Sequence, residues 1–226
     1  MNTVRKSLKP AAKLAIFSLC FAAITAAHAQ KQSAQQYLDV VIRADTFRGN
    51  AKRKPMVMEA LGNPKLSAPD SQVTADRMSF VVAGEKGITS AKAEGNVSMR
   101  TRLRSKTASG ETTDTVITGT ANLLSMDRAA GITQLLGNVK IRSESSDGRV
   151  LTASAQKATI YRSRNEAVLE GGVTFTLIAP GSLEGPATFT GETFVYNLST
   201  GEWSLRGTPQ SQPNLHFKAK GSKSGE

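Results

Sequence analysis

The strongest constraint on this chain is a short phrase that occurs five times, opened by Ala-Asp or a related pair and closed by Gly-Asn-Val or a relative. The copies start at residues 44, 75, 119, 153 and 191, and the closing glycine follows 18, 20, 18, 18 and 16 residues later. Every change in spacing is therefore a step of two residues. Because side chains alternate between the two faces of a β-strand, such steps keep the buried face buried. Repeats of this kind predict stacked hairpins that build one long sheet.

The apolar residues within each copy change parity once. They occupy Leu151, Ala153 and Ala155 and then move to Ala158 and Ile160. Residues 116–141 overlay residues 150–175 without a gap at an offset of 34, so the switch recurs. A reproducible parity switch within a strand indicates a bulge or a sharp bend. Since no long segment has helical periodicity, we predict an all-β fold, an elongated antiparallel sheet bent so that two arms face each other over an apolar interior.

Residues 1–29 have the composition of a signal peptide. Four basic residues precede an apolar run, and Ala27-His28-Ala29 supplies a small-residue cleavage site. An uncleaved membrane anchor is the alternative interpretation. A lipoprotein signal is rejected because Leu19, rather than a small residue, precedes Cys20. Cleavage predicts an exported, periplasmic protein that holds no disulfide, since Cys20 is the only cysteine of the chain.

The remainder of the chain is basic and long enough for one sizeable domain. Residues 1–29 carry four of the 29 Lys and Arg and none of the 18 Asp and Glu, which leaves a net charge of +7. We place the domain at residues 30–208 and a flexible tail at residues 209–226, within which residues 215–219 have the pattern of one more strand. Polar or Gly/Pro-rich composition predicts a turn at residues 50–55 and surface loops at residues 106–115 and 180–186.

The composition argues against catalysis. His216 is the only histidine after residue 29, and no cysteine remains there, which excludes Cys/His nucleophiles and His/Cys metal clusters. No glycine-rich phosphate-binding loop is present. We therefore predict a protein that is not an enzyme and needs no metal or cofactor. Nucleic acid is a poor match as well, because the basic stretches contain no aromatic residues for base stacking and the protein is expected to be exported.

Three phrases carry a family resemblance: residues 73–78 (VTADRM), residues 136–141 (LGNVKI) and residues 151–153 (LTA). They resemble the LptA/OstA family of periplasmic lipopolysaccharide-transport proteins over roughly residues 38–208. The resemblance implies a V-shaped β-jellyroll, or β-taco, that binds the acyl chains of lipopolysaccharide and bridges inner to outer membrane. It also implies contacts with other Lpt-type jellyroll components at both sheet edges and head-to-tail self-association. An inner-membrane-tethered, LptC-like sister component and a stacked-β protein that binds or cleaves glycans are the alternatives.

The interior of the bent sheet is where we expect a lipid to bind. Alternation alone favours an ordinary packed core without a ligand, because half-buried strands share this pattern. The resemblance is what favours a groove. The ten groove candidates are Met78, Phe80, Val97, Met99, Val139, Ile141, Ile160, Val173, Phe175 and Phe194.

Four basic residues are expected on the opposite, outward face. Arg100 and Arg102 alternate with Met99, and Lys140 and Arg142 alternate with Val139 and Ile141. These cations are candidates for contact with lipid phosphates or with an anionic membrane surface. The alternative is a solvated face whose charges discourage aggregation.

Overall fold

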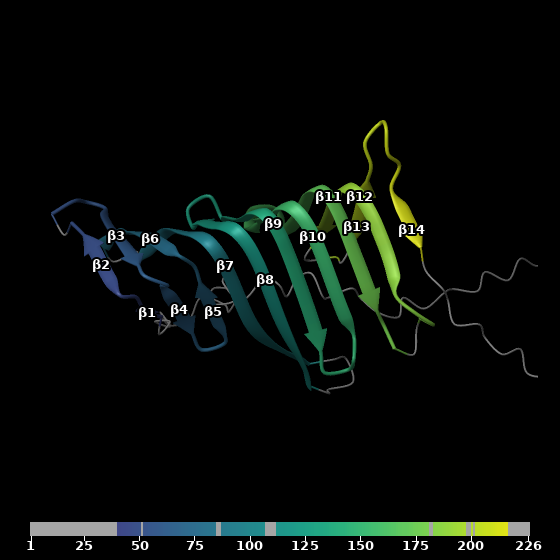
Figure 1. The fold of residues 1–226 in the computed structure, drawn as a ribbon, viewed down its shortest axis with the longest axis horizontal. Coiled ribbons are helices and arrows are strands. Elements are labelled where there is room, and N and C mark those ends of the chain that lie inside the picture. Colours follow the sequence, from purple (N-terminus) through teal and green to yellow (C-terminus); the bar gives the residue numbers. More distant parts are fainter. Residues whose placement is uncertain are drawn as a thin grey trace, which may run out of the picture.

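The described residues form one antiparallel sheet of fourteen strands. The computed structural model describes residues 40–50, 52–84, 87–106, 112–180, 183–197, 200 and 202–216, so the predicted signal peptide lies outside the described residues. The strands follow one another along the length of the sheet (Figure 1). They are β1 (Val41–Arg43), β2 (Thr46–Gly49), β3 (Met56–Leu61), β4 (Lys65–Ala68), β5 (Ser71–Thr74), β6 (Arg77–Val82), β7 (Ile88–Lys106), β8 (Thr112–Asp127), β9 (Ile132–Ser145), β10 (Val150–Tyr161), β11 (Glu166–Ile178), β12 (Ala187–Asn197), β13 (Trp203–Arg206) and β14 (Asn214–His216).

The predicted all-β class is confirmed, and the only helical element that lies wholly within the described ranges is the single 3-10 turn η3 (Arg162–Arg164). Each long strand pairs with its sequence neighbours, in the order β7-β8-β9-β10-β11-β12. The stacked hairpins expected from the repeat are therefore present. Among the described residues, no helix has the length and hydropathy needed to cross a membrane.

The parity switch is a line of bulges that runs across the sheet. The strand register shifts between Glu94 and Val97 of β7, and the corresponding shifts recur on β8, β10 and β11. Gly95 and Asn96 both have positive φ, at 70° and 44°, and Gly137 and Asn138 repeat this geometry at 74° and 50°. Glycine and asparagine tolerate this left-handed backbone, which is why they close the repeated phrase.

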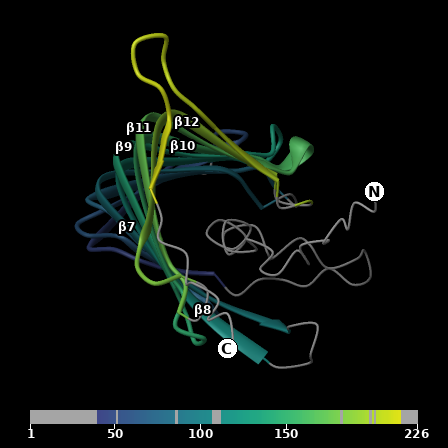
Figure 2. The ribbon, with the colours of Figure 1, turned by 90° about the vertical axis from the view of Figure 1, so that its right-hand side faces the viewer.

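The bulges bend the sheet into two arms that face each other, as seen along its length in Figure 2. The upper arm contains β2, β3, β6 and β13 together with residues 88–94, 123–127, 132–136, 157–161, 166–170 and 193–197 of the long strands. The lower arm contains β1, β4, β5 and β14 together with residues 97–106, 112–121, 139–145, 150–155, 173–178 and 187–191. Buried residues of both arms form one apolar cluster between them.

Two boundaries differ from the sequence-based expectation. The expected loop at residues 106–115 is shorter, because Lys106 still belongs to β7 and Thr112–Thr115 already belong to β8. Thr113 and Thr115 are buried there, so these polar residues continue the inward-facing row that Ile117 belongs to. The sheet also continues past residue 208, since β14 pairs with Thr188–Thr190 of β12, where the pattern of residues 215–219 predicts one more strand. Residues 52–55 and 183–186 lie outside the named strands, in agreement with the turn and the loop that the composition predicts there.

Candidate functional site

All ten groove candidates lie in the apolar cluster between the arms. Each side chain is 4% exposed or less. Met78, Phe80, Ile160 and Phe194 come from the upper arm, whereas Val97, Met99, Val139, Ile141, Val173 and Phe175 come from the lower arm. The structure thus brings together every residue of the predicted set. In this arrangement they belong to one buried apolar cluster.

An aromatic cluster forms the C-terminal end of this interior. Phe175 stacks on Phe194 with ring centroids 5.5 Å apart, and Phe194 stacks on Trp203 at 6.0 Å. Phe189 meets Phe175 and Trp203 edge-on, at 5.4 and 5.6 Å. Trp203 is partly exposed on the edge strand β13. The strand register sets it beside Tyr196 of β12, which places it in this cluster.

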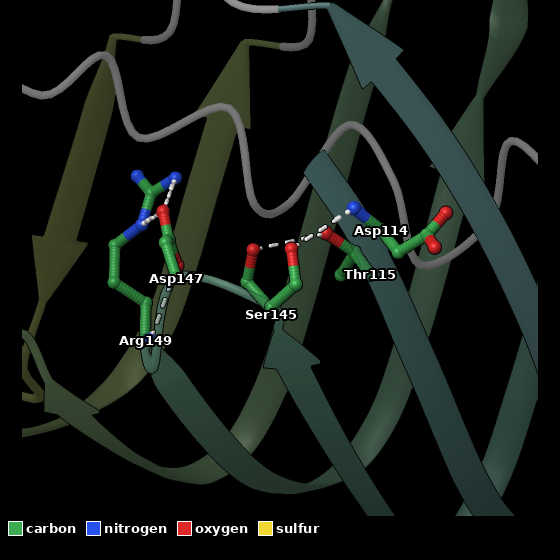
Figure 3. Close-up of polar contacts among 6 residues, drawn as sticks. Asp114, Thr115, Ser145, Asp147 and Arg149 are labelled. Atoms are coloured by element: carbon green, nitrogen blue, oxygen red, sulfur yellow. Dashed lines mark hydrogen bonds and ion pairs between the residues drawn. The ribbon is translucent and has the colours of Figure 1, made fainter. Parts of the chain in front are cut away.

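The inward-facing row becomes polar toward the free end of the lower arm. Thr101 and Thr115 are buried, and their hydroxyls contact those of Ser71 at 2.9 Å and Ser145 at 3.3 Å. Figure 3 shows Ser145 and Thr115 beside the hairpin tip, where Arg149 Nε donates to Asp147 Oδ2 at 2.6 Å. This hydrogen bond lowers the pKa of the Asp147 carboxyl. The interior is therefore amphipathic, with apolar side chains at the bend and hydroxyls near the opening.

Sequence reasoning missed this hydroxyl-bearing part of the interior because residues 106–115 were expected to form a loop. The alternation of Thr113, Thr115 and Ile117 was the signal that would have found it. Threonine has a high strand propensity, so a threonine-rich stretch with period-2 alternation indicates a strand more strongly than a loop.

The four cation candidates lie on the outer face of the lower arm, and all are exposed. Two of them are engaged by carboxylates. Arg102 Nη2 donates to Asp114 Oδ2 at 2.8 Å, which lowers the pKa of that carboxyl, and Arg142 pairs with Glu144. In the described part of the chain, neither Arg100 nor Lys140 has a carboxylate within ion-pair distance.

The sheet itself separates these cations from the apolar interior. Lys140 and Val139 are neighbours along β9 and project to opposite faces, the first exposed and the second buried. If the acyl chains of a lipid lay between the arms, the rest of the lipid would project through the opening opposite the bend. Its headgroup would therefore not reach Arg100 or Lys140 through the sheet.

The described residues offer no cluster of three or more His, Cys, Asp or Glu side chains arranged to hold a metal ion. The fold and site define a class of protein, an open, bent antiparallel β-jellyroll whose two inner faces share one apolar cluster. No family model and no curated protein matches this sequence.

One similar solved structure is that of LptH from Pseudomonas aeruginosa, described as the LptA-homologous periplasmic component of the conserved lipopolysaccharide transport device. The two chains are 10% identical, the match covers 80% of this chain and 95% of LptH, and the TM-score is 0.39.

Proposed function

We propose that this protein is a periplasmic carrier that binds lipopolysaccharide and shields its acyl chains between the two arms. The observation that supports this most directly is the single apolar cluster shared by both arms, in a sheet whose described strands do not pair across the opening. The resemblance of the repeated phrases to the LptA/OstA family points the same way. Export through residues 1–29 forms part of this proposal.

The energetic need for such a carrier is large. Each methylene removed from water contributes about 0.8 kcal/mol, so shielding several chains of about a dozen carbons is worth on the order of 40 kcal/mol. A folded sheet that offers apolar contacts along its whole length provides that shielding without a membrane.

Binding would proceed by exchange of apolar neighbours, because the candidate residues are buried in the free protein. The arms are joined only along the bend, so parting them lets acyl chains replace the contacts that one inner face makes with the other. Met78 and Met99 suit this exchange, since methionine is flexible and adapts to irregular apolar surfaces. Little apolar area would be exposed to water at the end of such an exchange.

The ends of the sheet suit contacts with further jellyroll segments. Among the described strands, β1, β2, β13 and β14 each pair with one other strand, so each has a backbone edge without a partner in the described part of the chain. Each also carries one exposed large hydrophobic residue, namely Val41, Phe47, Trp203 or Leu215. We propose head-to-tail contacts at these ends, either with another copy or with other Lpt-type components, which would extend the apolar interior from the inner toward the outer membrane.

A photocrosslinking pair on one strand tests the lipid proposal. A photoreactive phenylalanine analogue at Phe175 lies inside the lower arm, and the same analogue at Val168 lies on the outer face of the upper arm, also on β11. We expect irradiation with lipopolysaccharide to label the Phe175 variant and leave the Val168 variant unlabelled. Equal labelling of the two variants, or no labelling of the Phe175 variant, would count against an acyl-chain site between the arms.

A further inference from the structure

A depression of about 410 Å³ lies on the outer face of the lower arm, opposite the apolar cluster. Thr118 and Thr120 of β8, Lys140 of β9, and Thr152 and Ser154 of β10 contribute to its walls. These five side chains all belong to the outward-facing parity of their strands, and all are at least partly exposed. The depression is therefore separate from the candidate lipid site.

The register places the polar groups of this depression in two parallel rows. Thr120, Lys140 and Ser154 are direct cross-strand partners in one row. Thr118, Arg142 and Thr152 form the other. Neighbours within a row are about 4.8 Å apart, and the rows are about 6.8 Å apart, from the ordinary dimensions of a sheet. The spacing within a row is close to the length of one sugar ring in an extended glycan.

The hydroxyls of these rows are free to bind a ligand. Within the described ranges, the side chains of Thr118, Thr120, Thr152 and Ser154 have no hydrogen-bond partner in the protein. Each hydroxyl donates one hydrogen bond and accepts others, so it can pair with the hydroxyls of a saccharide in either direction. The accessible wall around these hydroxyls is mainly carbon, so hydroxyl groups and apolar surface are combined there, as the hydroxyls and ring faces of a saccharide require.

The cations in and beside the depression favour an anionic ligand. Lys140 has no carboxylate partner in the described part of the chain, and Arg100, next to Thr118 across the strands, likewise has none. Arg142 is paired with Glu144, so its charge is largely offset. The net field over Thr118 and Thr120 is positive, and it would favour one phosphate or carboxylate beside Lys140.

Two other anionic partners fit less well. Membrane recognition by basic residues relies on clusters of four to eight Lys or Arg. Within the described residues this surface has two cations without a carboxylate partner, Lys140 in the depression and Arg100 beside it. Protein partners are usually anchored by buried aromatic or arginine side chains, whereas no aromatic side chain lines the depression and its one arginine, Arg142, is exposed and paired with Glu144.

We propose that the outer face of the lower arm binds an anionic saccharide, with its phosphate or carboxylate at Lys140 and its ring hydroxyls on the threonine and serine rows. This site is distinct from the interior, and it stands whether or not the interior carries lipid. The saccharide chemistry occurs both in the sugar region of a lipopolysaccharide and in free acidic glycans, and titration with acylated and deacylated probes separates the two sources.

The test is calorimetric titration of the full-length chain with three probes: fully deacylated lipopolysaccharide, the same oligosaccharide after dephosphorylation, and intact lipopolysaccharide. We expect the deacylated, phosphorylated oligosaccharide to bind, and its affinity to fall with added salt and to drop about tenfold on dephosphorylation, since a tenfold change corresponds to one good charge-assisted contact. Binding of this probe without any acyl chain would identify a saccharide source that is independent of the lipid. If only intact lipopolysaccharide binds, the outer site is refuted and the acyl-chain proposal survives.

Matched variants locate the site. Lys140→Gln is expected to weaken binding of the phosphorylated oligosaccharide by about tenfold, and Thr120→Val, which removes a hydroxyl at nearly constant shape, by a smaller factor of about threefold. Arg48→Gln removes an exposed cation on β2 in the upper arm and is expected to change nothing. Unchanged binding in both Lys140→Gln and Thr120→Val would overturn the proposal. Preferential binding to phosphatidylglycerol vesicles, lost in Lys140→Gln, would also overturn it, in favour of a membrane contact.

Discussion

The bend of the sheet makes a quantitative prediction, because two of its glycines have similar backbones and different surroundings. Gly95 has a φ of 70° and Gly172 a φ of 65°. A Cβ added at Gly95 would lie 2.2 Å from Asp76 Oδ2, whereas a Cβ added at Gly172 would meet nothing within 4 Å. The pair Gly95→Ala and Gly172→Ala therefore separates backbone strain from side-chain collision.

The expected magnitudes follow from these contacts. Alanine in the left-handed region is strained by about 1–2 kcal/mol, and the loss of glycine's freedom in the unfolded chain offsets about 0.4–1 kcal/mol of that. Gly172→Ala should thus lower the free energy of unfolding by about 1 kcal/mol. In Gly95→Ala the Asp76 carboxylate must also move, which breaks the hydrogen bonds that Asn96 Nδ2 donates to it at 3.0 and 3.3 Å. We expect that loss to add about 1–2 kcal/mol at this exposed site.

Urea unfolding monitored by the fluorescence of Trp203, the only tryptophan of the chain, measures both values. Adding Asp76→Ala to both the wild type and Gly95→Ala completes a double-mutant cycle. We expect the excess cost at Gly95 to disappear once the Asp76 carboxylate is gone, with an unchanged denaturant slope. Equal destabilisation by Gly95→Ala and Gly172→Ala, or an excess that persists without Asp76, would refute the role of the Asp76 contact at the bend.

Three further outcomes are expected. Leu135→Ala, at a fully buried position in the interior, should lower the free energy of unfolding by about 2–5 kcal/mol, and the outward-facing neighbour Leu136→Ala should lower it by less in the same urea titration. The hydrogen bond from Arg149 lowers the pKa of the Asp147 carboxyl, so this contact stabilises the fold above the unfolded-state pKa and stops doing so as the pH falls through the folded-state pKa. The urea midpoint of the wild type should therefore decrease below about pH 4. In Asp147→Asn the decrease should be less steep. Truncation after Thr208 removes β14 and exposes an edge of β12, so size-exclusion chromatography should reveal stronger concentration-dependent self-association, and an unchanged elution profile would argue against an edge contact there.

The face that each interior side chain adopts could be predicted from the sequence, because alternation with period 2 is a local property. Val139 and Ile141 are two residues apart, so they were expected on the same face of a strand. The change in the parity of the apolar residues between Ala155 and Ala158 indicated an irregularity of the strand there. The sequence alone therefore sorts these residues into the correct groups. The alternation does not distinguish an open groove from a closed core, because both arrangements place the same residues inside.

The contacts that could not be predicted from the sequence are those that depend on the register between strands. The pairing of Arg102 with Asp114 joins β7 to β8, and the sequence between these two residues does not specify the alignment of the strands. The same holds for the outer depression, which combines Thr120, Lys140 and Ser154 from three strands. Thr113 and Thr115 were assigned to a loop because they lie in a polar stretch, and the hydrophobicity of that stretch gives no sign of the burial that the structure shows.

The bulges explain how one sheet can keep two chemically different faces through a sharp bend. On β8, Ile117, Gly119 and Ala121 face the interior, and Thr118 and Thr120 face outward. A bend made by one irregular strand alone would leave its neighbours out of step, and polar side chains would enter the apolar cluster. Because β7, β8, β10 and β11 all shift register at the bend, the inward face stays apolar on both sides of the bend. The spacing of the repeat must then vary in steps of two residues, since any odd change would exchange the apolar interior with the hydroxyl-bearing outer surface of the same strand.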